Sequence, residues 1–138
     1  MDPVLLRGLP YPNADRLVVL IGTVQRATVE RRGNSLPDHL DWRAKSTTFD
    51  DMAAYTQLSM TLAGSGADEP ERIPMEAVSS PYFSLLSISP IHGRTFRPEE
   101  DAVPDRDYVA ILSDGLWRRR FGADPSIIDQ TIQLSGRT

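Results

Sequence analysis

The chain has 138 residues, 40% hydrophobic and 25% charged, a composition typical of one globular domain. A formal net charge of −4 argues against a nucleic-acid binder, since phosphate contacts need a basic excess. The lack of cysteine excludes disulfides, zinc–thiolate sites and thiol nucleophiles, and no apolar run reaches the roughly 18 residues of a membrane span.

The first 35 residues predict an arm, a strand and a loop. Residues 1–15 are expected to be an extended linker, because three prolines and Gly8 disfavour a helix. The continuous apolar run Leu17–Ile21, within residues 16–23, predicts a strand covered on both faces. The polar stretch Gln25–Ser35 predicts a loop.

Two helices are expected next. Pro37 suits the first turn of a helix that reaches about Lys45. A second short helix is predicted over Phe49–Tyr55, with Thr47 or Thr48 as its N-cap and Asp50 and Asp51 in its first turn.

Strict alternation predicts an antiparallel hairpin in the middle of the chain. Apolar residues alternate with polar ones over Tyr55–Ala63 and again over Glu71–Ser79, with a turn predicted at Gly64–Asp68. Pro74 cannot donate to a ladder, so its strand is predicted to lie at an edge.

The last third predicts short alternating elements. Ser80–Pro81 is expected to open a helix, residues 87–106 a loop, and Tyr108–Leu112 a second buried strand. The other expected elements are a helix capped by Ser113 or Asp114 and ending at Gly122, a helical turn at Asp124–Ser126, and a last strand over Thr131–Leu134.

These elements predict an α/β (α+β) fold with a mixed, partly antiparallel sheet and short flanking helices. Ser135–Gly136–Arg137–Thr138 reads as a hairpin turn without its return strand, so we expect an incomplete domain.

No pattern for chemistry emerges from the titratable residues. Phosphate-loop and zinc-helix motifs are absent, and His39 and His92 are isolated from each other. The acidic run Glu99–Glu100–Asp101, with Asp105 and Asp107 nearby, lacks calcium-loop spacing and is expected to be a solvated loop. Ser79, Ser80 and Ser113 lie where helix caps belong. We therefore expect no catalytic, cofactor-binding or metal-binding residue.

Two further features are candidates for contacts. The basic run Arg118, Arg119 and Arg120 is expected on a solvated helix face, with contact to a partner as the alternative. Trp42 and Trp117 are expected to be core anchors.

A succession of short motifs resembles one known family. In chain order these are Val4–Pro12 followed by Asp15–Val18, Asp41–Arg43 with Phe49, Pro70–Arg72, Val78–Phe83, Gly93–Phe96 running into Glu99–Asp101, Val109–Ser113, Leu116–Gly122, Asp124–Pro125 and Ile132–Gly136. This order is similar to the MacB-like periplasmic core domain of ABC transporter permeases, and most similar to the duplicated orphan permeases of acidobacterial type. Gly8 departs from the family pattern, in which proline is usual.

The resemblance implies an extracytoplasmic position. Residues 1–15 would follow a transmembrane helix that is missing from this sequence, and residues 16–138 would be the N-terminal part of the core domain. Its partners would be the membrane helices of its own permease chain, an ABC ATPase subunit acting indirectly, and extracytoplasmic proteins. It would relay conformational change, as part of an FtsX-like permease or an efflux complex, without catalysing a reaction.

Two other hypotheses stay open. One is a hydrolase or metal enzyme built on the carboxylates of residues 99–107. The other is a small-ligand or protein-binding domain unrelated to transport, with an apolar groove lined by Trp42 or Trp117.

Overall fold

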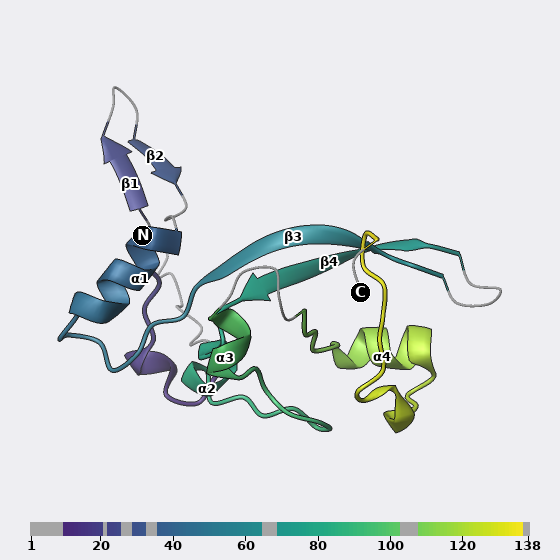
Figure 1. The fold of residues 1–138 in the computed structure, drawn as a ribbon. Helices are drawn as coiled ribbons and strands as arrows, with labels where there is room; N and C mark the ends of the chain where they lie inside the picture. Colours follow the sequence, from purple (N-terminus) through teal and green to yellow (C-terminus); the bar gives the residue numbers. More distant parts are fainter. Residues whose placement is uncertain are drawn as a thin grey trace, which may run out of the picture.

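A computed structural model describes residues 10–20, 22–25, 29–32, 36–64, 69–102 and 108–136. Two antiparallel hairpins and several short helices make up a mixed α/β fold, which confirms the predicted class (Figure 1). In chain order the elements are η1 (Ala14–Arg16), β1 (Gly22–Gln25), β2 (Val29–Arg32), α1 (Leu36–Lys45), β3 (Tyr55–Leu62), β4 (Glu71–Val78), α2 (Tyr82–Leu85), α3 (Pro98–Asp101), α4 (Asp114–Phe121) and η2 (Pro125–Ile127).

The long β3–β4 hairpin is the frame of the molecule, and its prediction is confirmed. Leu58 lies opposite Met75 and Met60 opposite Ile73, so the apolar positions of both strands share one face. Ser59 lies opposite Pro74, whose strand is at the edge of its two-stranded sheet, as expected. Most of the predicted turn, residues 65–68, lies outside the described residues.

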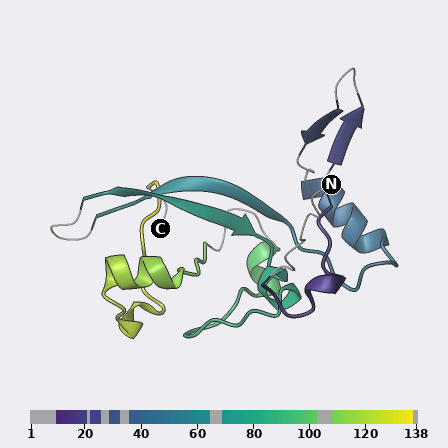
Figure 2. The same cartoon turned by 180° about the vertical axis from the view of Figure 1, so that it is seen from behind.

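The predicted C-terminal strand forms only in part. Leu134 makes an isolated antiparallel bridge to Leu62 on β3. The backbone N–H of Ala63 donates to Gln133 (2.9 Å), and that of Ser135 donates to Thr61 (2.7 Å). These bonds join residues about 70 positions apart, and both views show the C-terminal segment meeting the hairpin (Figures 1 and 2).

Helix α4 is confirmed together with its predicted ends. The Ser113 side chain accepts a hydrogen bond from the backbone N–H of Leu116, which caps the helix. Gly122 ends it in the left-handed conformation at φ 60°. Asp124 then caps the expected helical turn η2 through the N–H of Ser126 (2.8 Å). Helix α1 also has the predicted bounds.

The predicted buried strand at Leu17–Ile21 is wrong over its described residues. Residues 17–20 form no regular element, and Val18 and Val19 are 64% and 61% exposed. An apolar run becomes a central strand only where neighbouring strands flank it, and residues 17–20 belong to neither of the two described sheets. The chain instead pairs β1 with β2, so the loop predicted at residues 25–35 contains a strand.

The predicted helix at Phe49–Tyr55 is also wrong. Residues 46–54 are irregular, because side chains satisfy the local backbone: Ser46 Oγ accepts from the N–H groups of Thr48 and Phe49. Asp50 and Asp51 therefore serve no helix terminus. Asp50 accepts a hydrogen bond from Arg16, and Asp51 one from Arg43.

Three expectations between residues 80 and 112 need correction. Helix α2 begins at Tyr82 with Pro81 as its N-cap, and no side chain caps it. The expected loop contains the short helix α3. The expected strand at 108–112 is irregular, with Tyr108 51% exposed, since no described strand pairs with it.

The core is small. Among the described hydrophobic residues, Leu62 (3% exposed) and Ile73 (7%) are the buried core. Trp42 is 41% exposed, which contradicts its predicted role as a core anchor, whereas Trp117 is half-buried. Several large hydrophobic side chains of the described chain are exposed, among them Val19 (61%), Ile91 (78%) and Tyr108 (51%). Much apolar surface therefore stays accessible.

Candidate functional site

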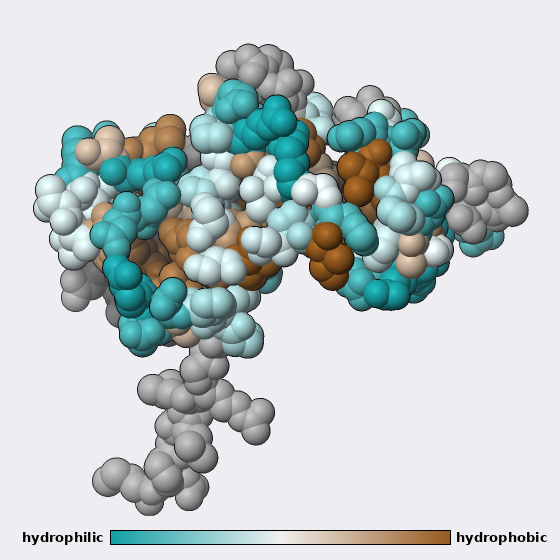
Figure 3. All heavy atoms as spheres, turned by 90° about the horizontal axis from the view of Figure 1, so that it is seen from below, coloured by the Kyte–Doolittle hydropathy of each residue, from teal (hydrophilic) through white to brown (hydrophobic). Residues whose placement is uncertain are grey.

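The apolar face of the β3–β4 hairpin lines a groove of about 1370 Å³. The face seen from the helix side shows hydrophobic side chains gathered in a hollow between hydrophilic rims (Figure 3). Leu58, Met60 and Met75 line it from the hairpin, and Phe83, Phe96, Ile111, Leu112, Trp117, Ile127, Ile132 and Leu134 line it from the other elements. A groove of this size and lining is suited to apolar groups.

Four aromatic rings follow one another at the α2 end of the hairpin. Tyr55 and Tyr82 lie 6.1 Å apart, Tyr82 and Phe83 5.4 Å, and Phe83 and Phe96 5.8 Å between ring centroids. These are favourable tilted and edge-to-face distances. The rings therefore hold α2 and the 87–97 segment against β3.

Within this cluster, Tyr82 forms a hydrogen bond through its hydroxyl. Its hydroxyl donates to Glu76 Oε2 at 3.2 Å. Burial, and then the negative charge of Glu76, raises the pKa of Tyr82 to about 12. The phenol is therefore neutral at physiological pH and acts as a hydrogen-bond donor.

The acidic run at 99–101 has structural contacts. Glu100 accepts two hydrogen bonds from Arg94 (2.6 and 3.1 Å) and one from the Arg97 backbone (2.8 Å), which together lower its pKa. Asp101 accepts from the backbone N–H of Ser80, which ties α3 to α2. No group of three metal-ligating side chains occurs in the described part of the chain. Asp105 and Asp107 lie outside it.

The three consecutive arginines of α4 contact acidic residues of the same chain. Arg118 pairs with Asp114 one turn earlier (2.9 Å), and its guanidinium lies 5.7 Å from the Trp117 ring. Arg119 pairs with Glu71 at the start of β4 (2.7 Å). Arg120, with a 14% exposed side chain, donates to the Glu69 carbonyl (3.2 Å). Contact of these arginines with a partner stays a prediction.

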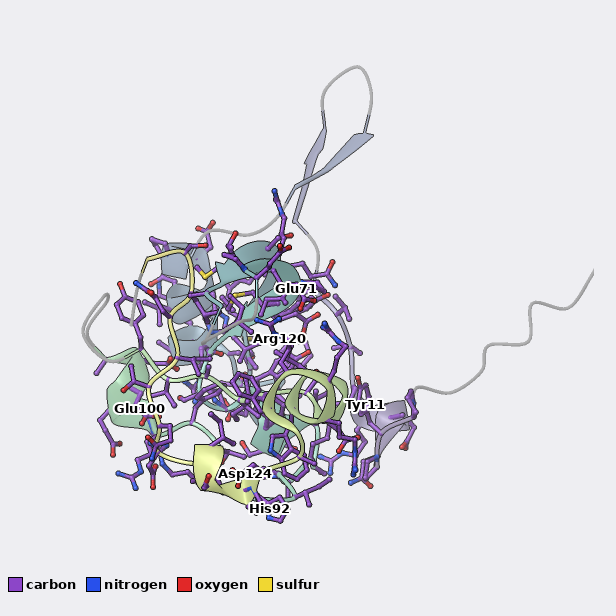
Figure 4. All side chains as sticks on the ribbon, turned by 90° about the vertical axis from the view of Figure 1, so that its right-hand side faces the viewer. Tyr11, Glu71, His92, Glu100, Arg120 and Asp124 are labelled. Atoms are coloured by element: carbon purple, nitrogen blue, oxygen red, sulfur yellow. The ribbon has the colours of Figure 1, made fainter. Side chains whose placement is uncertain are left out.

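Glu71 is the acceptor that joins α4 to the hairpin. The hydrogen bond from Arg119 lowers the pKa of Glu71, and the charge of Arg120 at 3.7 Å adds to this. Figure 4 shows Glu71 and Arg120 pointing toward one another between the hairpin and α4. The basic run thus fixes one wall of the groove.

Trp117 and His92 form the far end of the groove. The indole N–H of Trp117 donates to the Asp124 carbonyl (2.9 Å), and the His92 ring meets the indole at 5.3 Å and 62°. The predicted groove residue Trp117 is therefore in place, but Trp42 does not line the groove. His39, half-buried on α1, does not line it either.

Sequence reasoning missed most of the lining. Phe96, in the expected loop at residues 87–106, lines the groove, and so does Ile132 of the expected last strand, which was not predicted to face the hairpin. The alternation over Leu58, Met60 and Met75 was the available signal, since it marks one apolar face but not what lies opposite.

The N-terminal segment is attached to the body at a defined point. Arg16, the last residue of η1, pairs with Asp50 at 2.5 Å across an exposed surface. Arg43 of α1 pairs with the adjacent Asp51 at 2.9 Å. The described part of the N-terminal segment, from residue 10, is thus placed beside the residues that follow α1.

Small α/β domains with an apolar groove serve many different functions. The chain matches the family of MacB-like periplasmic core domains over residues 9–138, and it belongs to that family. The predicted family is confirmed, whereas the acidobacterial subtype stays a prediction.

Membership of this family indicates the kind of protein to which the domain belongs and the side of the membrane on which it lies. The family is a domain of ABC transporter permeases, not an enzyme family, and it lies on the extracytoplasmic side of a membrane protein. Within the described ranges no helix has the length and apolarity needed to cross a bilayer. Neither the curated proteins nor the solved structures that were compared contain a match.

Proposed function

We propose that this domain relays conformational change between the membrane helices of an ABC permease and a substrate or partner outside the membrane. The observation that carries the proposal is the family match over residues 9–138. In this proposal residues 1–15 connect residues 16–138 to a transmembrane helix of the same permease. An ATPase subunit drives the movement indirectly, and efflux is the expected direction of transport.

The geometry of the arm supports a mechanical role. A relay needs a stiff connector and a firm attachment to the body. Pro10 and Pro12 restrict the backbone of the connector, and the Arg16–Asp50 pair attaches it beside α1. Movement of the connector would therefore be passed to the whole body.

Spin-label distances in the full-length permease with its ATPase would test the relay. One label is placed at the exposed Ile91→Cys position (78% exposed) and one in a membrane helix. We expect the distance to change between the nucleotide-free and the ATP-trapped states. A Pro10→Gly, Pro12→Gly double variant should reduce that change, because glycine makes the connector flexible.

A matched control is a Pro70→Gly, Pro125→Gly double variant, which makes the same substitution at two exposed prolines outside the connector. It should leave the change in distance intact. A distance that stays the same in both nucleotide states of the unmodified permease would contradict the relay.

A second candidate is the binding of a small apolar molecule, favoured by the groove that Trp117 lines. Trp42→Phe leaves Trp117 as the sole tryptophan, since the chain has two. Saturable quenching of its fluorescence by candidate ligands would support this function, and the loss of quenching in Met60→Glu would assign it to the groove.

A further inference from the structure

The outer edges of β3 and β4 differ in how well they are protected against pairing with another strand. The backbone N–H of Ser79 donates to the Ala54 carbonyl, which places the odd-numbered residues of β4 in hydrogen-bonded pairs with β3. The backbone groups of residues 72, 74, 76 and 78 therefore face away from β3, a position that suits Pro74 because proline has no N–H. This outer edge carries Arg72, Pro74 and Glu76. Proline and charged residues on an edge discourage strand addition.

The β3 edge lacks this protection. The backbone groups of Thr61 and Ala63 form hydrogen bonds with the C-terminal segment, on the side of β3 away from β4. The backbone N–H and C=O groups of the other odd-numbered residues of β3 therefore also face away from β4. Further along that edge are Tyr55, Gln57 and Ser59, all exposed and uncharged, with no proline among them. No described residue pairs with their outward backbone groups.

In the described part of the chain, the β3 edge is paired only at its C-terminal end. The C-terminal segment uses Thr61 and Ala63, and Ser135 and Gly136, the last described residues, take left-handed conformations (φ 49° and 80°) that do not belong to a strand. The open part of the edge is thus continuous with a strand interface that already exists.

We propose that this edge pairs with the same edge of a second copy of the chain, β3 against β3 in antiparallel register around Gln57. Two-fold pairing places Tyr55 opposite Ser59 of the second copy and Gln57 opposite Gln57. Every facing position is uncharged, so no like-charge repulsion opposes the contact. The two hairpins then form one continuous antiparallel sheet with both apolar faces on the same side.

Sedimentation equilibrium of the 138-residue chain tests this interface. We expect a species of twice the 15.4 kDa chain mass that increases with concentration. Gln57→Pro should abolish it, because proline removes an outward donor without touching the β3–β4 ladder. Arg72→Pro makes the same change on the β4 edge and should leave the dimer intact.

Gln57→Lys is a second variant that tests the same interface if the proline variant fails to fold. It places two ammonium groups opposite each other across the two-fold axis, while each can still pair with Glu76 of its own chain, the residue that Gln57 contacts at 3.2 Å. We expect this variant to be folded by circular dichroism and monomeric. A folded Gln57→Lys variant that still dimerises would overturn the proposal.

A single cysteine then reports the register, because the chain has none of its own. Residues directly opposite in a hydrogen-bonded pair have Cα atoms about 5.5 Å apart, within disulfide range. Mild oxidation should cross-link Gln57→Cys into a dimer at least ten times faster than Arg72→Cys. Equal rates, or a chain that is monomeric at every concentration, would contradict the interface.

Discussion

Arg119 on α4 and Glu71 at the first position of β4 form an ion pair of 2.7 Å between residues 48 positions apart. With the nearby contacts of Arg120, this pair joins the only long helix of the described C-terminal half to the hairpin. It therefore gives the acidic and basic residues at this end of the groove a structural role.

The pair predicts a pH dependence of stability. Because Arg119 lowers the pKa of Glu71 below its ordinary value of 4.5, the contribution of Glu71 is complete above pH 4.5 and is lost as pH falls through the lower folded-state pKa. Thermal melts should show Glu71→Gln less stable than wild type near neutral pH, with a difference that vanishes in acid.

Glu69→Gln is the matched control for Glu71→Gln. It changes a neighbouring carboxylate and keeps the backbone carbonyl that Arg120 contacts. If both variants gave the same profile, the pH dependence would come from net charge and not from the Arg119–Glu71 pair.

Because the core is small, shortening a buried side chain should lower the unfolding free energy far more than shortening an exposed one. Leu62 is 3% exposed and bridges to Leu134, so Leu62→Ala removes packed contacts and should cost about 2 kcal/mol or more of unfolding free energy. Ile91→Ala, at a position 78% exposed, should change it by less than about 0.5 kcal/mol. Urea unfolding measures both, and equal costs would contradict the assigned core.

Replacing either of two glycines, one inside α4 and one at its end, by alanine should change the stability of the chain in opposite directions. Gly122 has φ 60°, so Gly122→Ala should destabilise the chain by about 1 kcal/mol through backbone strain alone. A Cβ at either Gly122 or Gly115 meets nothing within 4 Å. Gly115→Ala, inside the helix, should therefore stabilise by about 0.5 kcal/mol. Thermal unfolding of the two variants checks the signs, and destabilisation by both would be a contradiction.

The parts of the fold that follow from sequence are those set by neighbouring residues. Leu58 and Met60 alternate with polar residues, which marks an amphipathic strand, and Ser113 and Gly122 fit the two ends of a helix. Each of these signals acts within a few residues, so no knowledge of distant parts of the chain was needed.

The parts that could not be predicted depend on distant partners. Val18 and Tyr108 lie in apolar runs that resemble central strands, yet no described strand pairs with either run. The same limit applies to the groove: Trp117 could be proposed as a lining residue, but its closeness to the hairpin depends on the Arg119–Glu71 pair across 48 positions.

The side of the membrane on which the domain lies tests the central claim most directly. In the full-length permease, with any other cysteine replaced, the exposed Ile91→Cys is treated with a membrane-impermeant maleimide in intact cells whose outer layer, if present, is permeabilised. We predict complete labelling before the cytoplasmic membrane is disrupted. Labelling that occurs only after its disruption would contradict an extracytoplasmic domain.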